Sequence, residues 1–398
     1  MSAPSYPMRR GGPFDPPPQL AAVQSGDRLI RVTLWDGSNP WLITGYDEVR
    51  AILSDERVSV DSDLPGYPHM SAGSAARRRR AKMFVNMDKS EHRRVRSLVT
   101  PDFLVKRMER LRPQMQRALD GFIDDMLAGP NPADLVEAIA LPLPSFAICE
   151  LLGVPYSERE LFHGLSKTII SGRTPPVEAV AALETMLDFM AGLVDAKEKD
   201  PGDDMISRLV VQQLRPGTLA REDLVNTAQL MLLGGHETTA NMIALGTLAL
   251  LQHPGVLAEV RASDDPKLIA NTVEELLRWL SILHQGRRRI ALADIEIGGT
   301  VIRAGEGIVV ANDIANRDPA AFPDPDTLDI HRKARHQVGF GFGVHQCVGQ
   351  PLARMELQVV YSTLYRRIPT LALAVGLDDI EFKHDNVVYG VSELPVTW

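Results

Sequence analysis

The chain has 398 residues, of which 44% are hydrophobic, and this is enough apolar material to bury a substantial core. Its 51 acidic residues outnumber its 43 lysines and arginines, and the net charge of −8 argues against nucleic acid as a general partner. Because only two cysteines occur, a disulfide framework is not expected and a reducing cytoplasm suits the sequence.

The first part of the chain predicts little regular structure. Residues 1–27 are proline-rich and predict an irregular arm without the apolar segment of a signal peptide. The β-rich stretches 28–35 and 41–44 flank turn-forming residues and predict a β-hairpin, followed by a short helix over 46–53. Residues 60–86 are rich in glycine, proline and serine, and they predict a loop whose basic run Arg77–Arg80 is solvated.

Helical periodicity dominates from residue 91 onward. Helices are predicted over 91–99, 106–128, 133–153, 157–171, 176–198, 203–213, 221–253, 255–262 and 267–281. Strands are expected between 286 and 314, coil over 315–349, a helix from just after Cys347 to about Arg367, and β-hairpins from Leu371 to the end. The sequence therefore predicts one domain over residues 1–398, mainly α with a small β region (α+β). Its small sheet is expected to combine both chain ends with the strands after residue 286.

Cys347 lies in a glycine-rich turn directly before the last long helix. Unpaired backbone amides and the helix dipole at such a position stabilise a thiolate. The cysteine could be a buried structural residue, a nucleophile assisted by His345, or a ligand of haem iron. The other cysteine, Cys149, lies in an apolar helical run and is expected to be inert.

Five residues around this cysteine match, without a gap, the pattern Phe-x-x-Gly-x-His/Arg-x-Cys-x-Gly: Phe340, Gly343, His345, Cys347 and Gly349. The pattern resembles the haem-binding sequence of the cytochrome P-450 family of haem-thiolate monooxygenases. The resemblance covers residues 28–398 and is closest to the soluble actinobacterial class. It implies a helical prism enclosing haem b, with the cysteine as iron ligand and with haem contacts from Phe340, Gly341, Gly349, Ala353 and Gly235.

The longest apolar run, 224–251, contains Gly234-Gly235-His236-Glu237-Thr238-Thr239. Each glycine costs about 1 kcal/mol relative to alanine inside a helix, so a flat ligand or a neighbouring helix is expected to approach the backbone here. A charge at its centre makes a membrane span costly, and a buried helix is predicted. The hexapeptide resembles the family's oxygen-activation sequence, which implies that Thr238 hydrogen-bonds the oxygen being activated and that Glu237 relays protons from solvent.

Several charged residues match family positions that surround the haem. His92 and Arg96, four apart on one predicted helix face, together with Arg289 and His345, are expected to reach the haem propionates, whereas Arg287-Arg288 is expected to face solvent.

A further match is structural. Glu275 and Arg278 correspond to the family's Glu-x-x-Arg and are expected to form a buried ion pair that supports the fold, without a catalytic role.

The resemblance implies an enzyme that hydroxylates an apolar terpenoid, steroid-like molecule, macrolide or xenobiotic. It uses O2 and two electrons from a ferredoxin and its reductase, and it is expected to be a monomer without membrane attachment. Exposed Arg93 and Arg94 are expected to help receive the ferredoxin. Substrate contacts are expected from Phe84, Val85, Leu230, Leu233, Gly234, Ile282, Leu283 and Val391.

Two alternatives remain open. Residues 64–88, with their basic run, resemble the segment of fungal nitric oxide reductases in which a basic loop receives NADH, although those enzymes lack the acid found here at Glu237. A non-catalytic haem sensor or carrier would not need Glu237 beside Thr238.

Overall fold

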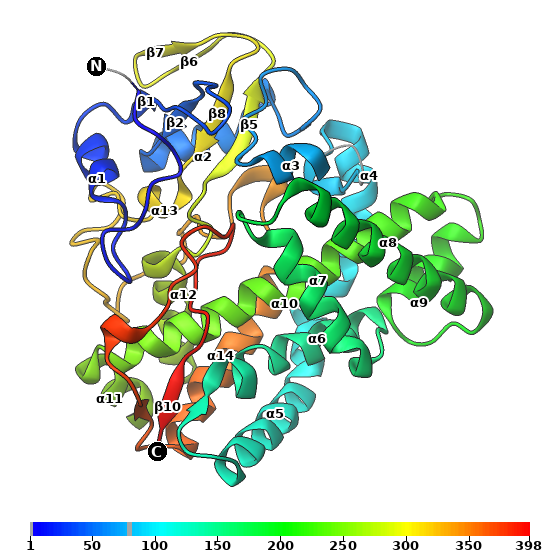
Figure 1. The fold of residues 1–398 in the computed structure, drawn as a ribbon, viewed down its shortest axis with the longest axis vertical. Coiled ribbons are helices and arrows are strands. Elements are labelled where there is room, and N and C mark those ends of the chain that lie inside the picture. The colour runs from blue at the N-terminus through cyan, green and yellow to red at the C-terminus, as the bar shows by residue number, and fades with distance from the viewer. Residues whose placement is uncertain (1–2, 78–81) are drawn as a thin grey trace.

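The computed structural model describes residues 3–77 and 82–398 and is mainly helical, as the sequence predicts (Figure 1). The helices are α1 Pro18–Ser25, α2 Tyr46–Ser54, α3 Ala72–Arg77, α4 Lys89–Val99, α5 Val105–Ala128, α6 Pro142–Leu152, α7 Arg159–Ile170, α8 Pro176–Lys199, α9 Met205–Leu209, α10 Arg221–Leu251, α11 Pro254–Ala262, α12 Pro266–Leu280, α13 Asn312–Ala315 and α14 Gln350–Arg367. Shorter 3-10 or π turns include η1 Phe84–Asn86, η2 Thr100–Phe103, η3 Val136–Ala140, η5 Val210–Leu214 and η6 Gly343–His345.

The strands form three small sheets. The largest has the order β1-β2-β8-β5-β3, built from Leu29–Arg31, Trp41–Ile43, Gly307–Val310, Arg287–Ala291 and Val58–Ser59. β6 (Ile295–Ile297) pairs with β7 (Thr300–Ile302), and β10 (Pro395–Thr397) lies between β4 (Ala133–Asp134) and β9 (Ala372–Leu373). The expected hairpin is confirmed, with Leu29 opposite Ile43.

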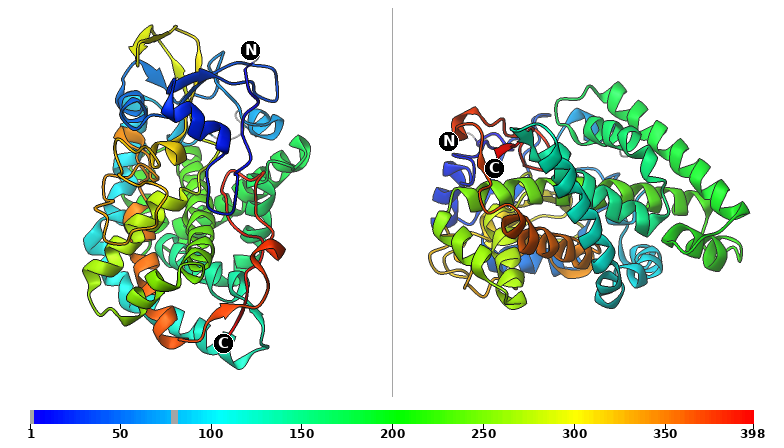
Figure 2. Two further views of the ribbon diagram at one scale, coloured as in Figure 1. Left: turned by 90° about the vertical axis from the view of Figure 1, so that its left-hand side faces the viewer. Right: turned by 90° about the horizontal axis from the view of Figure 1, so that it is seen from below.

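One expectation about the sheets is wrong. The C-terminal strands do not join the N-terminal sheet; β10 pairs antiparallel with β4 and β9 instead. The N-terminal and C-terminal ends lie at opposite ends of the molecule's long axis (Figure 2). Strand pairing between distant segments depends on this placement, which local sequence patterns do not contain.

Three local expectations also need correction. The N-terminal arm contains α1, whose Pro18 occupies a first-turn position where the missing amide costs little. The loop over 60–86 contains α3 and η1, and the part of its basic run from Arg78 to Arg80 lies outside the described residues. The helix expected over 133–153 begins as strand β4, continues through the π turn η3, and becomes α-helical only at Pro142.

α10 is the central element of the helical core. Its 31 residues form one continuous helix that is buried along most of its length and packs on α6, α8 and α14 (Figure 1). Within the described chain, no helix by itself has the length and apolar character of a membrane span. Only α10 and α11 taken together reach that threshold, and they are bent by 109°.

The expected pair on α12 is fully buried. Arg278 Nε and Nη2 each donate to a different Glu275 carboxylate oxygen at 2.8 Å, and neither side chain is exposed. Arg278 Nη1 also donates to the carbonyl oxygens of Asn316 and Pro325, at 2.8 Å each. The pair therefore attaches α12 to the coil that leads to the Cys347 turn.

Replacing one partner of this pair should strand a buried charge. We expect Glu275→Gln to lower the free energy of unfolding by about 3–5 kcal/mol, measured by urea denaturation. Glu109→Gln is the matched control, because Glu109 and Arg112 have the same spacing but lie 49% and 34% exposed. It should change stability by less than about 0.5 kcal/mol. Equal small losses for both variants would contradict a structural role for the buried pair.

Candidate active site

The turn that carries Cys347 is shaped by glycines. Gly341 and Gly343 have φ of +80° and +72°, and a Cβ atom on Gly343 would lie 2.5 Å from the Leu53 carbonyl oxygen. The Cys347 amide donates to the Phe340 carbonyl at 2.9 Å, which closes the turn immediately before α14. Burial raises the pKa of the Cys347 thiol, while the Arg287 charge and the amide of Gly349 oppose this increase.

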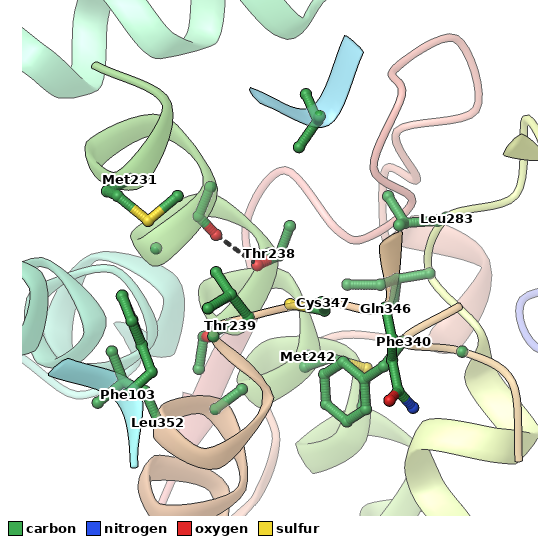
Figure 3. A pocket seen from close by; sticks show the side chains of 18 of the residues that line it. Phe103, Met231, Thr238, Thr239, Met242, Leu283, Phe340, Gln346, Cys347 and Leu352 are labelled. Carbon is green, nitrogen blue, oxygen red and sulfur yellow. Dashed lines mark hydrogen bonds between the residues drawn. The ribbon is translucent and has the colours of Figure 1, made fainter. Parts of the chain in front are cut away.

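The sulfur faces an apolar cavity of about 310 Å³ (Figure 3). Figure 3 shows Thr238, Thr239 and Met242 of α10 directed toward the same space as Cys347. Thr238 Oγ1 donates to the Gly234 carbonyl at 2.9 Å, as expected for a threonine that bonds back one turn along its helix. The hydroxyl proton is used in this hydrogen bond, and the lone pairs of the oxygen can accept a further hydrogen bond.

The two glycines of α10 have different neighbours. Among the described residues, no atom outside the local helix lies within 4 Å of a Cβ atom built on Gly234, which leaves this side open to the cavity. A Cβ atom on Gly235 would lie 2.6 Å from Ile148 Cδ1 and 3.2 Å from Ile148 Cβ. Gly235 also lines the cavity, but its contact with α6 requires a residue without a side chain.

Glu237 lies on another side of α10 and does not line the cavity. Burial raises the pKa of its carboxyl group, and the positive charge of Lys383 acts in the opposite direction. Asn241 Nδ2 donates to the Glu237 carbonyl at 2.7 Å, and Lys383 Nζ donates to Asn241 Oδ1 at 3.2 Å. Asn241 Nδ2 also donates to Glu237 Oε2 at 3.5 Å, so Asn241 links the carboxyl group to Lys383 of the C-terminal segment.

The expected propionate-binding residues fall into two layers. Arg96 and His345 line the cavity, and the Arg96 guanidinium donates to the Gln346 carbonyl. His92 and Arg289 lie behind them: the His92 ring centroid is 4.0 Å from that of His345, and Arg289 Nη1 donates to the Arg288 carbonyl at 2.7 Å.

The expectation that Arg287 faces solvent is wrong, because its side chain lines the cavity. Residues two apart on a strand share a face, so Arg287 points to the same side of β5 as Arg289. Its Nη2 atom donates to the Gly339 carbonyl at 3.3 Å, but its Nε atom is buried without a partner.

The residues present fit a haem with two propionates. Arg287 Nε and His92 Nε2 are buried polar atoms without hydrogen-bond partners among the described residues, and an unpaired buried donor is costly. Glu356 is the one acidic residue in the described lining of the cavity, and burial raises the pKa of its carboxyl group well above the usual value, so burial disfavours a negative charge on it beside Arg287. A dianionic ligand beside Cys347 would satisfy both unpaired atoms.

Most predicted contact residues line this cavity. They are Phe84, Val85, Leu230, Gly234, Gly235, Ile282, Leu283, Phe340, Gly349 and Ala353. Gly341 lies outside the lining, and a Cβ atom on it would approach Arg287 Nε to 3.0 Å. Leu233 lines a neighbouring cavity, and Val391 lies buried outside both cavities, bridged to Phe382.

The sequence analysis missed several lining residues on α10. Met231, Thr239 and Met242 project into the cavity alongside Thr238. Positions 231, 235, 238 and 242 follow the spacing of one helix face, so helical periodicity extended from Thr238 would have found both methionines.

Comparison with known proteins agrees with this geometry. Residues 177–369 match the family model described as cytochrome P-450. Cytochrome P-450 GfsF of Streptomyces halstedii is 52% identical over 100% of this chain and 96% of its own, and its crystal structure superposes with a TM-score of 0.93 over 100% of both chains. The pentalenic acid synthase of Streptomyces avermitilis is 47% identical over 100% of this chain and 98% of its own.

A solved structure with a bound substrate is also similar. The mycinamicin VIII C21 methyl hydroxylase MycCI from Micromonospora griseorubida, bound to mycinamicin VIII, is 38% identical, with a TM-score of 0.93 over 99% of this chain and 100% of its own.

The chain belongs to the cytochrome P-450 family. It is a haem-thiolate monooxygenase that acts on small molecules.

Alanine substitutions at the two glycines should have opposite effects. We expect Gly235→Ala to cost about 1–3 kcal/mol of unfolding free energy, because Ile148 and its backbone would have to move. Gly234→Ala should stabilise by up to about 1 kcal/mol, because it removes a helix-interior glycine without a clash. Urea denaturation of both variants measures the difference, and the expectation is wrong if Gly234→Ala is the more damaging change.

Proposed function

We propose that this monooxygenase hydroxylates an apolar small molecule with electrons from a ferredoxin, and that haem b is bound through Cys347. The observation that carries the proposal is the apolar cavity in which the Cys347 sulfur and the Thr238 hydroxyl face the same space. When bound, haem supplies the centre at which dioxygen is reduced and one oxygen atom is transferred to a C–H bond. The surrounding residues must then hold the substrate, exclude bulk water and deliver protons.

Proton delivery follows from the arrangement on α10. Thr238 Oγ1 already donates to Gly234, so its oxygen accepts a hydrogen bond from a protonated group in the cavity. Glu237, the next residue along the chain, is buried, and its raised pKa favours the protonated form that can donate. Lys383 is partly exposed and reaches Asn241, so this side of α10 connects the glutamate to solvent.

Substrate binding is supported by the character of the cavity walls. Phe84, Ile282 and Leu283 contribute apolar surface opposite α10, which suits a terpenoid, steroid-like molecule, macrolide or xenobiotic. The names of two relatives, a pentalenic acid synthase and a mycinamicin methyl hydroxylase, support oxidation of a multi-carbon substrate.

The ferredoxin site is proposed on the surface outside the Cys347 turn. Arg96 connects α4 to this turn, and Arg93 on the same helix is exposed. Exposed large apolar side chains occur on both segments: Leu104 and Val105 follow η2, which continues from α4, and Val344 lies in η6 of the Cys347 turn. They are 55%, 64% and 68% exposed. A cation beside exposed apolar groups suits an acidic electron-transfer protein.

We further propose a cytoplasmic, single-domain monomer. Cys149 and Cys347 are both free thiols, and burial raises the pKa of Cys149 to about 12, which supports an inert packing role. Among the described residues, the exposed large apolar side chains occur singly or as the one adjacent pair Leu104-Val105.

The haem-thiolate assignment is tested by the spectrum of the reduced, carbon-monoxide-bound protein. A compound screen for spin-state shifts, followed by oxygen consumption with a surrogate ferredoxin and its reductase, tests hydroxylation. Formation of nitrous oxide from NADH and nitric oxide would instead favour the reductase alternative. A thiolate spectrum without substrate-dependent oxygen consumption would favour a haem sensor or carrier.

Removing the buried acid should impair proton delivery. We expect Glu237→Gln to slow product formation by at least about 100-fold and to raise the share of consumed oxygen released as hydrogen peroxide. Glu222→Gln is the control, because Glu222 lies exposed in the first turn of the same helix. A Glu237→Gln enzyme with normal rate and coupling would contradict the proton route.

Charge reversal at α4 tests the ferredoxin surface. We expect Arg93→Glu to slow reduction by the surrogate ferredoxin several-fold at low salt, with a smaller effect at high salt. Arg94→Glu should slow this reduction less than Arg93→Glu does, because Arg94 already pairs with Asp223 at 2.8 Å. Arg303→Glu, at an exposed pair with Asp294, is the control. Unchanged rates and salt dependence in the double variant Arg93→Glu/Arg94→Glu would exclude this surface.

A further inference from the structure

A second cavity of about 580 Å³ adjoins the apolar one. Its walls come from the N-terminal arm, α3, residues 170–173 after α7, and residues 384–387 of the C-terminal segment. Val85 and Leu230 line both cavities, so the two share a wall made by η1 and α10. One extended molecule can therefore contact both spaces.

The charged residues that line this second cavity are mainly positive, although the net charge of the chain is −8. Four arginines line it, Arg9, Arg77, Arg173 and Arg288, and the one acidic residue in the described lining is Asp385. Arg173 forms an ion pair with Asp385. No carboxylate among the described residues pairs with Arg77 or Arg288.

Arg77 and Arg288 lie close enough to repel each other. Burial lowers the pKa of the Arg77 guanidinium, and the charge of Arg288 lowers it further. Both side chains are only partly exposed, and the one hydrogen-bond partner of Arg288 among the described residues is the Gly286 carbonyl at 3.2 Å. Like charges held together at a cavity wall are stabilised when an anion binds between them.

We propose that Arg77 and Arg288 bind a carboxylate of the substrate, whose apolar part extends past Val85 and Leu230 into the cavity at Cys347. The inference rests on the proposed function and narrows the class of proposed substrates to amphiphilic acids. Arginine is suited to this role, since its planar guanidinium can bind a carboxylate with two parallel hydrogen bonds.

Matched probes test the proposal on the haem-loaded enzyme. Dodecanoate, dodecan-1-ol and dodecyltrimethylammonium share one apolar chain and differ in charge, and their dissociation constants are measured by spin-state titration and by equilibrium dialysis. We expect dodecanoate to bind at least about tenfold more tightly than the other two, with a preference that shrinks as salt is raised.

Variants test whether the preference for dodecanoate depends on the two arginines. The double variant Arg77→Gln/Arg288→Gln should lose it, Arg77→Lys/Arg288→Lys should keep part of it, and the surface control Arg303→Gln should keep all of it. The carbon-monoxide spectrum of each variant shows whether it folds and binds haem. If the glutamine variant does not fold, the lysine variant and the salt dependence still decide the outcome.

Several results would overturn the inference. Equal binding of the acid and the alcohol would do so, as would a preference that survives in the folded glutamine variant. NADH is titrated in the same way. If NADH binds and its binding requires both arginines, while the binding of dodecanoate does not require them, the cavity is a dinucleotide site. Failure of the proposed function is distinguishable, because it shows in the unmodified enzyme as an abnormal carbon-monoxide spectrum or as a lack of substrate-dependent oxygen consumption, whatever the probe preference.

Discussion

The sulfur of Cys347 at the N-terminus of α14 is the constraint on which the rest of the site depends. Burial disfavours a thiolate, and the charge of Arg287 and the amides of Gly349 and Gln350 partly compensate. A thiolate held this way needs an uncrowded approach from one side. The glycines of the preceding turn allow that turn to close, because side chains at Gly341 or Gly343 would meet Arg287 or the Leu53 carbonyl.

α10 serves three purposes on three of its sides. Gly234 and Thr238 face the cavity, Gly235 contacts α6, and Glu237 faces Lys383 and Asn241. A helix places neighbouring residues about 100° apart, so Gly234, Gly235, Glu237 and Thr238 can form a cavity face, a packing face and a face that we propose delivers protons.

Charge is distributed unevenly around the cavity. The Glu275–Arg278 pair is satisfied on both sides and is structural, whereas Arg287, Arg77 and Arg288 lack carboxylate partners in the described chain. Guanidinium groups without a carboxylate partner cost stability when they are partly or fully buried, and those at the two adjoining cavities are suited to anionic ligands. We propose that the haem propionates pair with Arg287 and that a substrate carboxylate pairs with Arg77 and Arg288.

Local sequence patterns determined much of this protein. The helical periodicity of α10 and its neighbours predicted the helical fold, and the match of Glu275 and Arg278 to a family pattern predicted the buried pair, because each depends on residues near one another in the chain. The match around the turn before α14 predicts Cys347 as the iron ligand by resemblance, and this stays a prediction. The tertiary structure decided the rest. The pairing of β10 with β4, the inward orientation of Arg287, the placement of Val391 outside the cavities and the meeting of Arg77 with Arg288 all join distant segments. Such contacts depend on how the elements pack, which no local pattern specifies.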